Sequence, residues 1–363
     1  MAANKHDELT LRLLDAVRSQ RYGERFPALR ELGGEYGAAL RTVCKAVEPL
    51  LAAGLVQPGP HGSVIRRFNS GRNFRTIGVV GVTFDVPGDD AMSRALGPIA
   101  EAAGYDVIDI RLKDNVLRDD PEYLVHFPVD GILFIYSSMS AVSLAALRRA
   151  GIPLVAGAKW WGPGKVVQSD GDLASGYRKL VNTLRKLGHK RIGWFSPERP
   201  REYRGYLDYM REIMEKETCG GFAPELFFTP SPHLEWLVDG DAAYYRRMAE
   251  SAVEYFGKLD SPPSAVIAGQ AFAEPMREIL RARGIETPRD ISLACVDSNG
   301  VPTADFTGVW YSAVERAVWG MKRLLEMLRG ELPQSCRMNQ APLWLPGATV
   351  GPAGKDQLHS HNR

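Results

Sequence analysis

Polar and aromatic side chains follow several apolar, β-branched stretches beyond residue 130. Each such stretch predicts a buried strand, so these residues come directly after the carboxyl ends of strands. They are Tyr136 and Ser137 after VDGILFI, Lys159, Trp160 and Trp161 after PLVAGA, Arg201 after GWFS, Gln270 after SAVIAG, and Asp297 after ISLACV. Aromatic rings cover the C–H faces of sugars, and planar polar groups bind sugar hydroxyls with paired hydrogen bonds. The set therefore predicts a site that suits a sugar-type ligand.

Some of these residues could instead serve the fold alone. Trp160 and Trp161 could pack beneath a loop, and Asp297 could cap the end of its strand. The ammonium group of Lys159 could select a sugar acid or a sugar phosphate rather than a neutral sugar. These alternatives leave the exact class of effector open.

A second group of residues that could do chemistry is basic and lies near the N-terminus. The segment 26–46, FPALRELGGEYGAALRTVCKA, places Arg30, Arg41 and Lys45 on the outer side of short helical patterns. Residues 1–75 contain 12 Lys and Arg against 7 Asp and Glu, whereas the remaining residues contain 33 against 36. A basic segment on a mildly acidic chain indicates that this segment meets a polyanion such as DNA.

The common signatures of enzymes and metal sites are missing from the sequence. It contains no GxSxG, HExxH, Walker loop or CxxC, and its four cysteines are far apart. We therefore expect neither an enzyme nor a cofactor, a metal site or a disulfide framework. The polar start MAANKHDELT has no apolar signal-peptide core, and no run of about 18 apolar residues occurs, so we expect a cytoplasmic protein with no membrane partner.

Three helices and a pair of short strands are predicted within residues 1–68. Apolar residues at helical spacing predict a helix over 8–19, a second that starts at Pro27, and a third that contains Pro49 and stops at Gly54. Pro49 should either kink the third helix or begin a new turn. Three glycines are expected to end the second helix, namely Gly33, Gly34 and Gly37. The stretch LVQPGPHGSVIRRF predicts two strands around a turn.

Strand and helix patterns alternate from residue 76 onward, after a linker at 69–75. Strands are expected in IGVVGV, YDVIDI, VDGILFIY, GIPLVA, KVVQSD, RIGWFS, ELFFT, SAVIAG and ISLACVD, with helices at 91–103, 119–126, 140–149 and 173–187. This alternation predicts parallel sheets covered by helices. The number of strands is too large for one compact sheet, so we expect an α/β domain of two lobes.

The N-terminal segment resembles the winged helix-turn-helix domain of GntR-type regulators. The resemblance rests on FPALREL, YGAALRTVCKAVEPLLAAGLV and GPHGSV. It implies that DNA contacts come from the third helix and the wing. The positions to which this points are Arg30, Ala39, Arg41, Thr42, Lys45, His61 and Gly62. Two departures from the family pattern are Ala39-Leu40 in place of Ser-Arg and Cys44 in place of a frequent arginine.

The remainder resembles the effector domain of the LacI family, which is built like periplasmic sugar-binding proteins. The stretch VVQSDGDLASGYRKLVNTLRKLGHKRIGWFS carries most of the resemblance, supported by SAVIAGQAFAEPMREILRARGIETPRDISLACVDSN, ADFTGV and LWLPGAT. It implies effector contacts at Asp297 and Gln270 and a structural role for His189. Ala271 replaces an aspartate that is usual in the family, and the usual arginine aligns on Glu202, beside Arg201.

We therefore predict a homodimeric regulator, more often a repressor than an activator, that binds operator DNA and a sugar-type effector. The predicted domains are a winged helix-turn-helix at 1–68, a linker at 69–75, a two-lobed domain at 76–354 and a tail at 355–363. Lobe 1 is expected at about 76–168 and 309–331, and lobe 2 at about 169–308 and 332–354. A solute-binding protein and a sugar-acting enzyme remain the alternatives.

Overall fold

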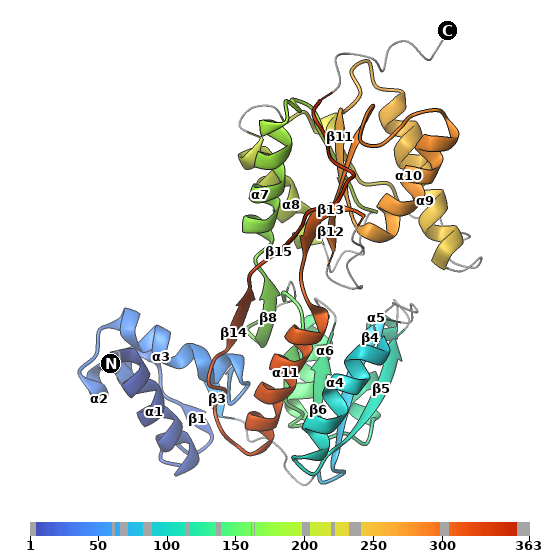
Figure 1. The fold of residues 1–363 in the computed structure, drawn as a ribbon. Helices are drawn as coiled ribbons and strands as arrows, with labels where there is room; N and C mark the ends of the chain where they lie inside the picture. Colours follow the sequence, from blue (N-terminus) through green and yellow to red (C-terminus); the bar gives the residue numbers. More distant parts are fainter. Residues whose placement is uncertain are drawn as a thin grey trace. The chain divides into compact units, whose positions relative to one another are not determined.

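A computed structural model describes the fold of the chain (Figure 1). It describes residues 5–59, 62–65, 72–82, 89–112, 116–135, 139–160, 162, 164–197, 204–218, 222–231, 241–297 and 305–353. The chain divides into two compact units. Unit 1 comprises Met1–Thr83, Asp90–Asp170 and Val314–Asn339, and unit 2 comprises Phe84–Asp89, Gly171–Ala313 and Gln340–Arg363. The units change after residues 170, 313 and 339, whereas the sequence places the lobe boundaries after 168, 308 and 331.

The N-terminal part of unit 1, here called the head, consists of described residues 5–59 and 62–65. It contains the helices α1 (Lys5–Arg18), α2 (Leu29–Tyr36) and α3 (Leu40–Ala52) and the strands β1 (Arg25–Phe26), β2 (Val56–Gly59) and β3 (Gly62–Ile65). The strands form an antiparallel sheet in the order β1-β3-β2. Buried Leu13, Leu32, Val43 and Leu50 close the core between the helices. The pairing of β2 with β3 is the one that the sequence predicts.

The second helix differs from its prediction at both ends. It begins at Leu29 rather than Pro27. Ala28 is its N-cap, and the backbone N–H of Ala28 donates to the Glu31 carboxylate at 2.8 Å. It continues through Gly33 and Gly34 and ends at Tyr36, since only Gly37 has the left-handed conformation (φ 60°) that stops the helix. Gly33 serves a close approach instead, because a Cβ there would lie 3.1 Å from the Ala38 carbonyl oxygen. Pro49 lies inside α3, which runs on to Ala52.

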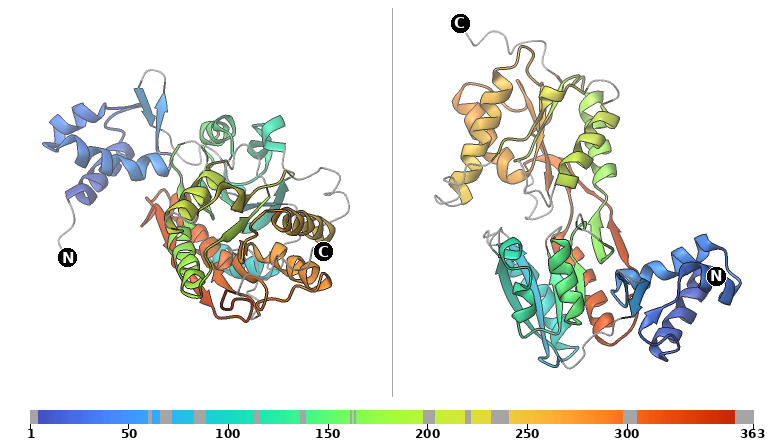
Figure 2. Two further views of the ribbon diagram at one scale, coloured as in Figure 1. Left: turned by 90° about the horizontal axis from the view of Figure 1, so that it is seen from above. Right: turned by 180° about the vertical axis from the view of Figure 1, so that it is seen from behind.

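The rest of unit 1, here called the first lobe, is a helix-covered sheet in the order β14-β8-β7-β6-β4-β5. Its elements are β4 (Thr76–Val82), α4 (Asp89–Glu101), β5 (Asp106–Leu112), α5 (Val116–Asp119), η1 (Tyr123–His126), β6 (Gly131–Phe134), α6 (Ala141–Arg149), β7 (Leu154–Ala156), β8 (Val167–Gly171), α11 (Ala313–Leu328) and β14 (Arg337–Gln340). Neighbouring strands from β5 to β8 are parallel. Helices α4 and α11 cover one face and α6 the other (Figure 2).

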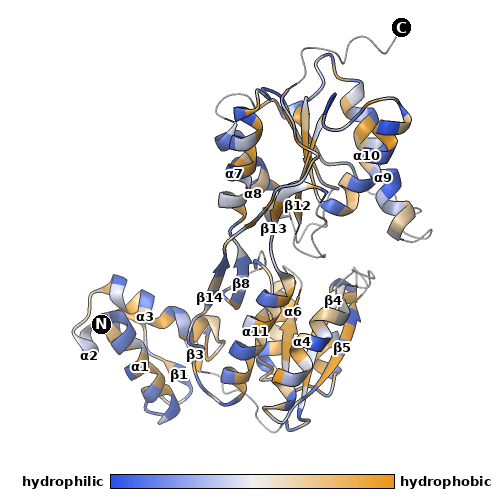
Figure 3. Ribbon diagram, in the orientation of Figure 1, coloured by the Kyte–Doolittle hydropathy of each residue, from blue (hydrophilic) through white to orange (hydrophobic). Residues whose placement is uncertain are grey.

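Hydropathy follows these layers. Strands β4 and β5 are mainly hydrophobic, whereas β8 and β14 at the other end of the sheet are hydrophilic (Figure 3).

The helix predicted at 119–126 is wrong as one element. It is split into α5 and η1 because Pro121 between them lacks an N–H and disfavours helix at Asp120.

Unit 2 is built on a sheet in the order β10-β9-β11-β12-β13-β15. Its elements are α7 (Leu173–Lys186), β9 (Ile192–Phe195), α8 (Arg204–Glu217), η3 (Pro224–Leu226), β10 (Phe227–Phe228), α9 (Asp241–Gly257), β11 (Ala265–Ala268), α10 (Gln270–Ala282), β12 (Ser292–Asp297), β13 (Thr307–Trp310) and β15 (Leu343–Leu345). All neighbouring strands are parallel except β15, which is antiparallel to β13. The predicted α/β architecture with parallel sheets is thus confirmed.

The glycines of SDGDLASGY are explained by one aromatic ring. The Tyr311 ring lies against Gly171 and Gly176, where a Cβ at either position would overlap with it. The Tyr311 hydroxyl donates to the Asp172 carbonyl at 2.8 Å, so this corner of unit 2 is both packed and hydrogen-bonded. At the other end of α7, His189 is 2% exposed, and its ring nitrogens lie 2.9 Å from Ser264 Oγ and 2.9 Å from the Gly351 carbonyl oxygen. These contacts agree with a structural role for His189.

Candidate functional site

The beginning of α3 is the first candidate site, because its backbone donors are not capped from within. Ala39 occupies the N-cap position and has no polar side chain, and the first turn contains no acidic residue. The Ala39 carbonyl accepts from Thr42 at 2.8 Å and Val43 at 3.1 Å, which starts the helix. An uncapped helix N-terminus presents N–H groups and a partial positive charge to an anion. A phosphate fits this end of α3.

Basic side chains are exposed on the first half of α3 and on the preceding helix α2. Arg30, near the start of α2, and Arg41 and Lys45, in the first half of α3, are all exposed. Within the described part of the chain, none of the three lies within 4.0 Å of a carboxylate. Their charges are therefore available to a polyanion rather than used for an internal ion pair. Thr42 is partly exposed beside them.

Leu40 belongs to the same surface, although the sequence did not identify it as a candidate. Its side chain is 49% exposed at the first position of α3, next to Arg41. A large apolar side chain on a basic surface is suited to contact with a thymine methyl group. The signal that could have identified Leu40 was its place within the departure from the family pattern.

The predicted wing residues are only partly described. Gly62 begins β3 and pairs with Gly59 at the tip of the hairpin. His61 lies outside the described residues.

The effector candidates of the first lobe follow β6 and β7, which are neighbours in the sheet. Lys159 lies 3.8 Å from the carboxylate of Asp170, and each side chain is about one quarter exposed. Asp170 was not among the predicted site residues. Its carboxylate offsets the charge of Lys159, which reduces the attraction of this site for an anionic effector.

Trp160 lies in the core of the first lobe. Its side chain is 8% exposed and packs edge to face on Phe134, and its backbone N–H donates to Gln168 Oε1 at 2.7 Å. Packing therefore accounts for this indole without a ligand, in agreement with the packing role that the sequence left open. A stacking role for Trp160 stays a prediction.

The effector candidates of unit 2 come from three adjacent strands. Arg201 follows β9, Gln270 begins α10 directly after β11, and Asp297 is the last residue of β12. Because these strands are parallel, their carboxyl ends lie at one edge of the sheet, which is where α/β sheets bind ligands. The Gln270 amide donates to Glu274 at 3.0 Å, which uses one of its two N–H groups. The Asp297 side chain is outside what the structure describes.

Four more of the predicted effector residues cannot be placed. Those outside the described residues are Tyr136, Ser137, Trp161 and Arg201. No group of three or more His, Cys, Asp or Glu side chains suited to a metal ion occurs in the described ranges. None of the described helices is both long enough and apolar enough to span a bilayer.

Comparison with solved structures shows the fold of the two-lobed part. A LacI transcriptional regulator from a Rhodococcus species is 17% identical with a TM-score of 0.60, covering 77% of this chain and 100% of its own. A LacI-family regulator from Enterococcus faecium with bound ribose is 15% identical with a TM-score of 0.59, covering 76% and 99%. One from Weissella paramesenteroides with bound sucrose is 14% identical with a TM-score of 0.59, covering 76% and 99%.

The sequence itself matches no family model and none of the curated proteins. The structural neighbours described above are LacI-type transcriptional regulators. This chain therefore shares with them an α/β fold with parallel sheets that is like the periplasmic-binding-protein-like domain of LacI regulators.

Proposed function

We propose that the chain is a transcriptional regulator, more often repressor than activator, whose winged helix-turn-helix head binds operator DNA under the control of a sugar-type effector. The beginning of α3 is the observation that carries this proposal. It joins backbone donors without a side-chain cap, the exposed basic side chains Arg30, Arg41 and Lys45, which form no ion pair with the described carboxylates, and an exposed Leu40. The backbone donors and the basic side chains suit phosphates, and the basic side chains and Leu40 suit base edges.

The three helices and the β2–β3 hairpin give the head the parts that a winged helix-turn-helix needs. In this arrangement α3 enters the major groove, and the hairpin with His61 and Gly62 lies along the backbone or the minor groove. Palindromic operators require two heads, so the functional unit is a homodimer. We place it in the cytoplasm, where the DNA is, and assign it no catalytic activity.

A neutral sugar or polyol is the effector class that the residue types at the strand ends favour. Ionised Asp297 would accept hydrogen bonds from sugar hydroxyls, and Gln270 could both accept and donate. The ion pair between Lys159 and Asp170 makes a sugar acid or phosphate the less favoured choice. The neighbours that hold ribose and sucrose in the same fold agree with this class.

Selection from a randomised duplex library with the full-length protein tests DNA binding. We expect one enriched, partly palindromic site, with an affinity that falls steeply as salt increases because phosphate contacts release counterions. Failure to enrich any sequence, together with a shallow dependence on salt, would contradict the proposal. A chain that bound sugars but no DNA would instead be a solute-binding protein.

A thermal-shift screen of sugars, polyols and sugar phosphates tests the effector class. A ligand at 100 times its dissociation constant stabilises the folded state by about 2.7 kcal/mol. Asp297→Asn should abolish the effect of the identified ligand on operator affinity and leave effector-free DNA binding within about tenfold, or about 1.4 kcal/mol. Asp260→Asn, an exposed carboxylate before β11, is the matched control. A full effector response in Asp297→Asn would leave Asp297 as a strand cap only.

A further inference from the structure

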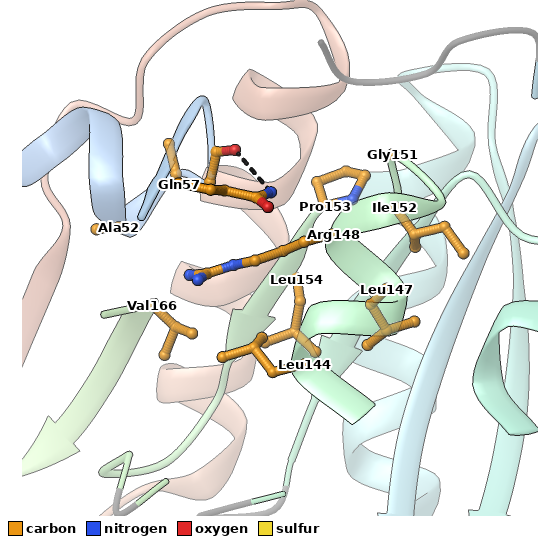
Figure 4. Close-up of a pocket in the computed structure, with 12 residues that line it drawn as sticks. Ala52, Gln57, Leu144, Leu147, Arg148, Gly151, Ile152, Pro153, Leu154 and Val166 are labelled. Atoms are coloured by element: carbon orange, nitrogen blue, oxygen red, sulfur yellow. Dashed lines mark hydrogen bonds between the residues drawn. The ribbon is translucent and has the colours of Figure 1, made fainter. Parts of the chain in front are cut away.

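The far end of α3 meets the first lobe inside unit 1. A cavity of about 20 Å³ separates them, lined on the head side by the end of α3 and by Gln57, and on the lobe side by α6, the start of β7 and Val166 (Figure 4). This volume holds a water molecule or two and is too small for a sugar or a nucleotide. We call this contact the α3–α6 junction, with Ala52, Ala53, Gln57 and Arg148 as its central residues.

Arg148 is the only charged residue among those that line this cavity. Its guanidinium extends across the cavity toward Ala52 and Val166, below Gln57 (Figure 4). It donates to the Lys165 carbonyl at 2.6 Å, and no described carboxylate lies within ion-pair distance of it. Burial lowers the pKa of Arg148 because the surroundings solvate its charge poorly. Arg148 is partly buried, and a partly buried cation is stabilised by carbonyl groups and by the negative end of a helix dipole.

The end of α3 brings such groups close to Arg148, because Ala52 and Ala53 line the same cavity. Gly54 (φ 76°) closes the helix, with Leu55 N–H donating to Leu50 and Gly54 N–H to Leu51. This closure leaves the carbonyls of Ala52 and Ala53 without a described backbone donor. The C-terminus of a helix also carries roughly half an elementary negative charge. The cation of the first lobe therefore lies at the negative end of the helix that we assign to DNA.

Two further contacts join the head to the first lobe. Lys165 pairs with Glu48 of α3 at 2.8 Å, with both side chains about half exposed. The Arg18 guanidinium at the end of α1 donates to the Gly330 carbonyl just beyond α11. One apolar cluster also runs through both parts, from Leu50 and Ala53 of the head to Leu324 of α11. The head is thus docked at its rear, while Arg30, Leu40, Arg41 and Lys45 remain exposed.

We propose that the α3–α6 junction holds the head docked on the first lobe in the orientation that binds operator DNA. The inference rests on the proposed function. A docked head has lost its orientational freedom before it meets DNA, so operator binding costs less entropy than for a head free on its linker. The DNA-binding end of α3 lies about 20 Å from the docked end, at 1.5 Å per residue over 13 residues. Docking and DNA binding can therefore occur together.

Cys336 offers a direct readout of docking that does not involve DNA. It packs against the shared apolar cluster, and burial together with the negative charge of Glu48 raises the pKa of its thiol to about 11. When the head leaves, both causes weaken, so the thiol ionises more readily and reacts faster. Cys44, exposed on α3, is an internal reference within the same molecule.

The experiment measures alkylation rates of Cys336 and Cys44 by peptide mass spectrometry in full-length protein, and operator affinity by anisotropy. Arg148→Ala should increase the alkylation rate of Cys336 severalfold and leave that of Cys44 unchanged. It should also weaken operator binding about fivefold or more. Lys165→Glu should do the same to a smaller extent, because its ion pair is exposed. Adding Glu48→Lys to Lys165→Glu should restore operator affinity. Arg149→Ala, an exposed neighbour on α6 that pairs with Glu122, should change nothing.

Each outcome decides the matter. Unchanged Cys336 alkylation in Arg148→Ala would overturn the junction as the docking contact. Faster alkylation with unchanged operator affinity would overturn its role in DNA binding. If the wild-type protein enriches no DNA site, the proposed function fails, while Cys336 alkylation still decides whether the head is docked by Arg148.

Discussion

Helices α3 and α7 have nearly the same length but begin in opposite ways. At α7 the Asp172 side chain caps the first turn, accepting from Ser175 N at 3.1 Å and Ser175 Oγ at 2.7 Å. At α3 the N-cap is Ala39, which has no side chain to cap with, and the side chains around it are basic and exposed. Short polar residues are the usual N-caps, and replacing one by alanine costs about 1 kcal/mol.

The difference separates a helix end used by the fold from one available to a ligand. The beginning of α7 is closed from within unit 2, because the Asp172 side chain accepts from Ser175 N and the Tyr311 hydroxyl donates to the Asp172 carbonyl. Helix α6 is closed in a similar way by Ser140, which accepts from Ser143 at 3.0 Å. Helix α3 of the head lacks the stabilisation of a side-chain N-cap. We interpret the open end as a phosphate site that becomes satisfied when DNA binds.

The largest expected effect concerns the closed end. Gly176→Ala would place a Cβ against the Tyr311 hydroxyl, with Val309 on the other side, so Tyr311 must move and lose its bond to Asp172. We expect a loss of about 3 kcal/mol in the free energy of unfolding, measured by urea denaturation. The matched control is Gly34→Ala in α2, where nothing lies within 4 Å of the new Cβ. That change should stabilise by about 0.5–1 kcal/mol. Equal effects at both sites would show that Tyr311 does not constrain α7.

The next effect concerns the open end. Arg41→Ala should weaken operator binding by roughly 1–3 kcal/mol if Arg41 contacts a guanine. The measurement is fluorescence anisotropy with the selected operator at fixed salt. Arg12→Ala removes the same charge from α1, where Arg12 pairs with Glu8, and should leave the affinity nearly unchanged. Unchanged affinity in Arg41→Ala would remove Arg41 from the interface.

A third change makes the open end resemble the closed one. Ala39→Asp should cap α3 and stabilise the head by about 1 kcal/mol. Its carboxylate would also occupy the helix end and repel phosphate, so operator affinity should fall by about tenfold, or about 1.4 kcal/mol. Thermal melting and anisotropy on the same variant test both signs. Ala39→Ser adds a cap without the charge and should lose less affinity. If Ala39→Asp bound the operator as tightly as the wild type, no phosphate would lie at this helix end.

The sequence predicted the parallel sheets because apolar runs and helical spacing are local signals. The patterns of IGVVGV, SAVIAG and ISLACVD became β4, β11 and β12. The end of α2 could not be predicted in this way. Three glycines are candidates for the helix end, and only the backbone conformation distinguishes them: Gly37 is left-handed, whereas Gly33 is helical and approaches the Ala38 carbonyl.

The candidate sites show the same limit. The positions of Gln270 and Asp297 at strand ends could be predicted, because apolar runs mark the strands that precede them, and their role in effector binding stays a prediction. The core position of Trp160 could not, because an indole after a strand is equally consistent with packing and with ligand stacking. Asp170 was missed because its relation to Lys159 depends on the neighbouring positions of β7 and β8. Leu40 was missed because exposure cannot be deduced from an apolar residue type.

The smallest expected effect is at the far end of α7, and it depends on pH. Burial lowers the pKa of His189, and its contact with the Gly351 carbonyl offsets this only in part. The folded state therefore binds the proton less tightly than the unfolded chain, in which the pKa of a histidine is about 6.5. Below that pH the unfolded state binds more protons, so the free energy of unfolding should decrease as pH falls from about 6.5 toward the lowered pKa and stay constant above it. His189→Gln is less stable at every pH, because it loses part of the contacts with Ser264 and Gly351, but it should show a flatter pH dependence between 7.5 and 5.5. Thermal midpoints of both proteins across that range give the comparison. Parallel curves would assign the pH dependence to groups other than His189 and leave this end of α7 held by neutral hydrogen bonds alone.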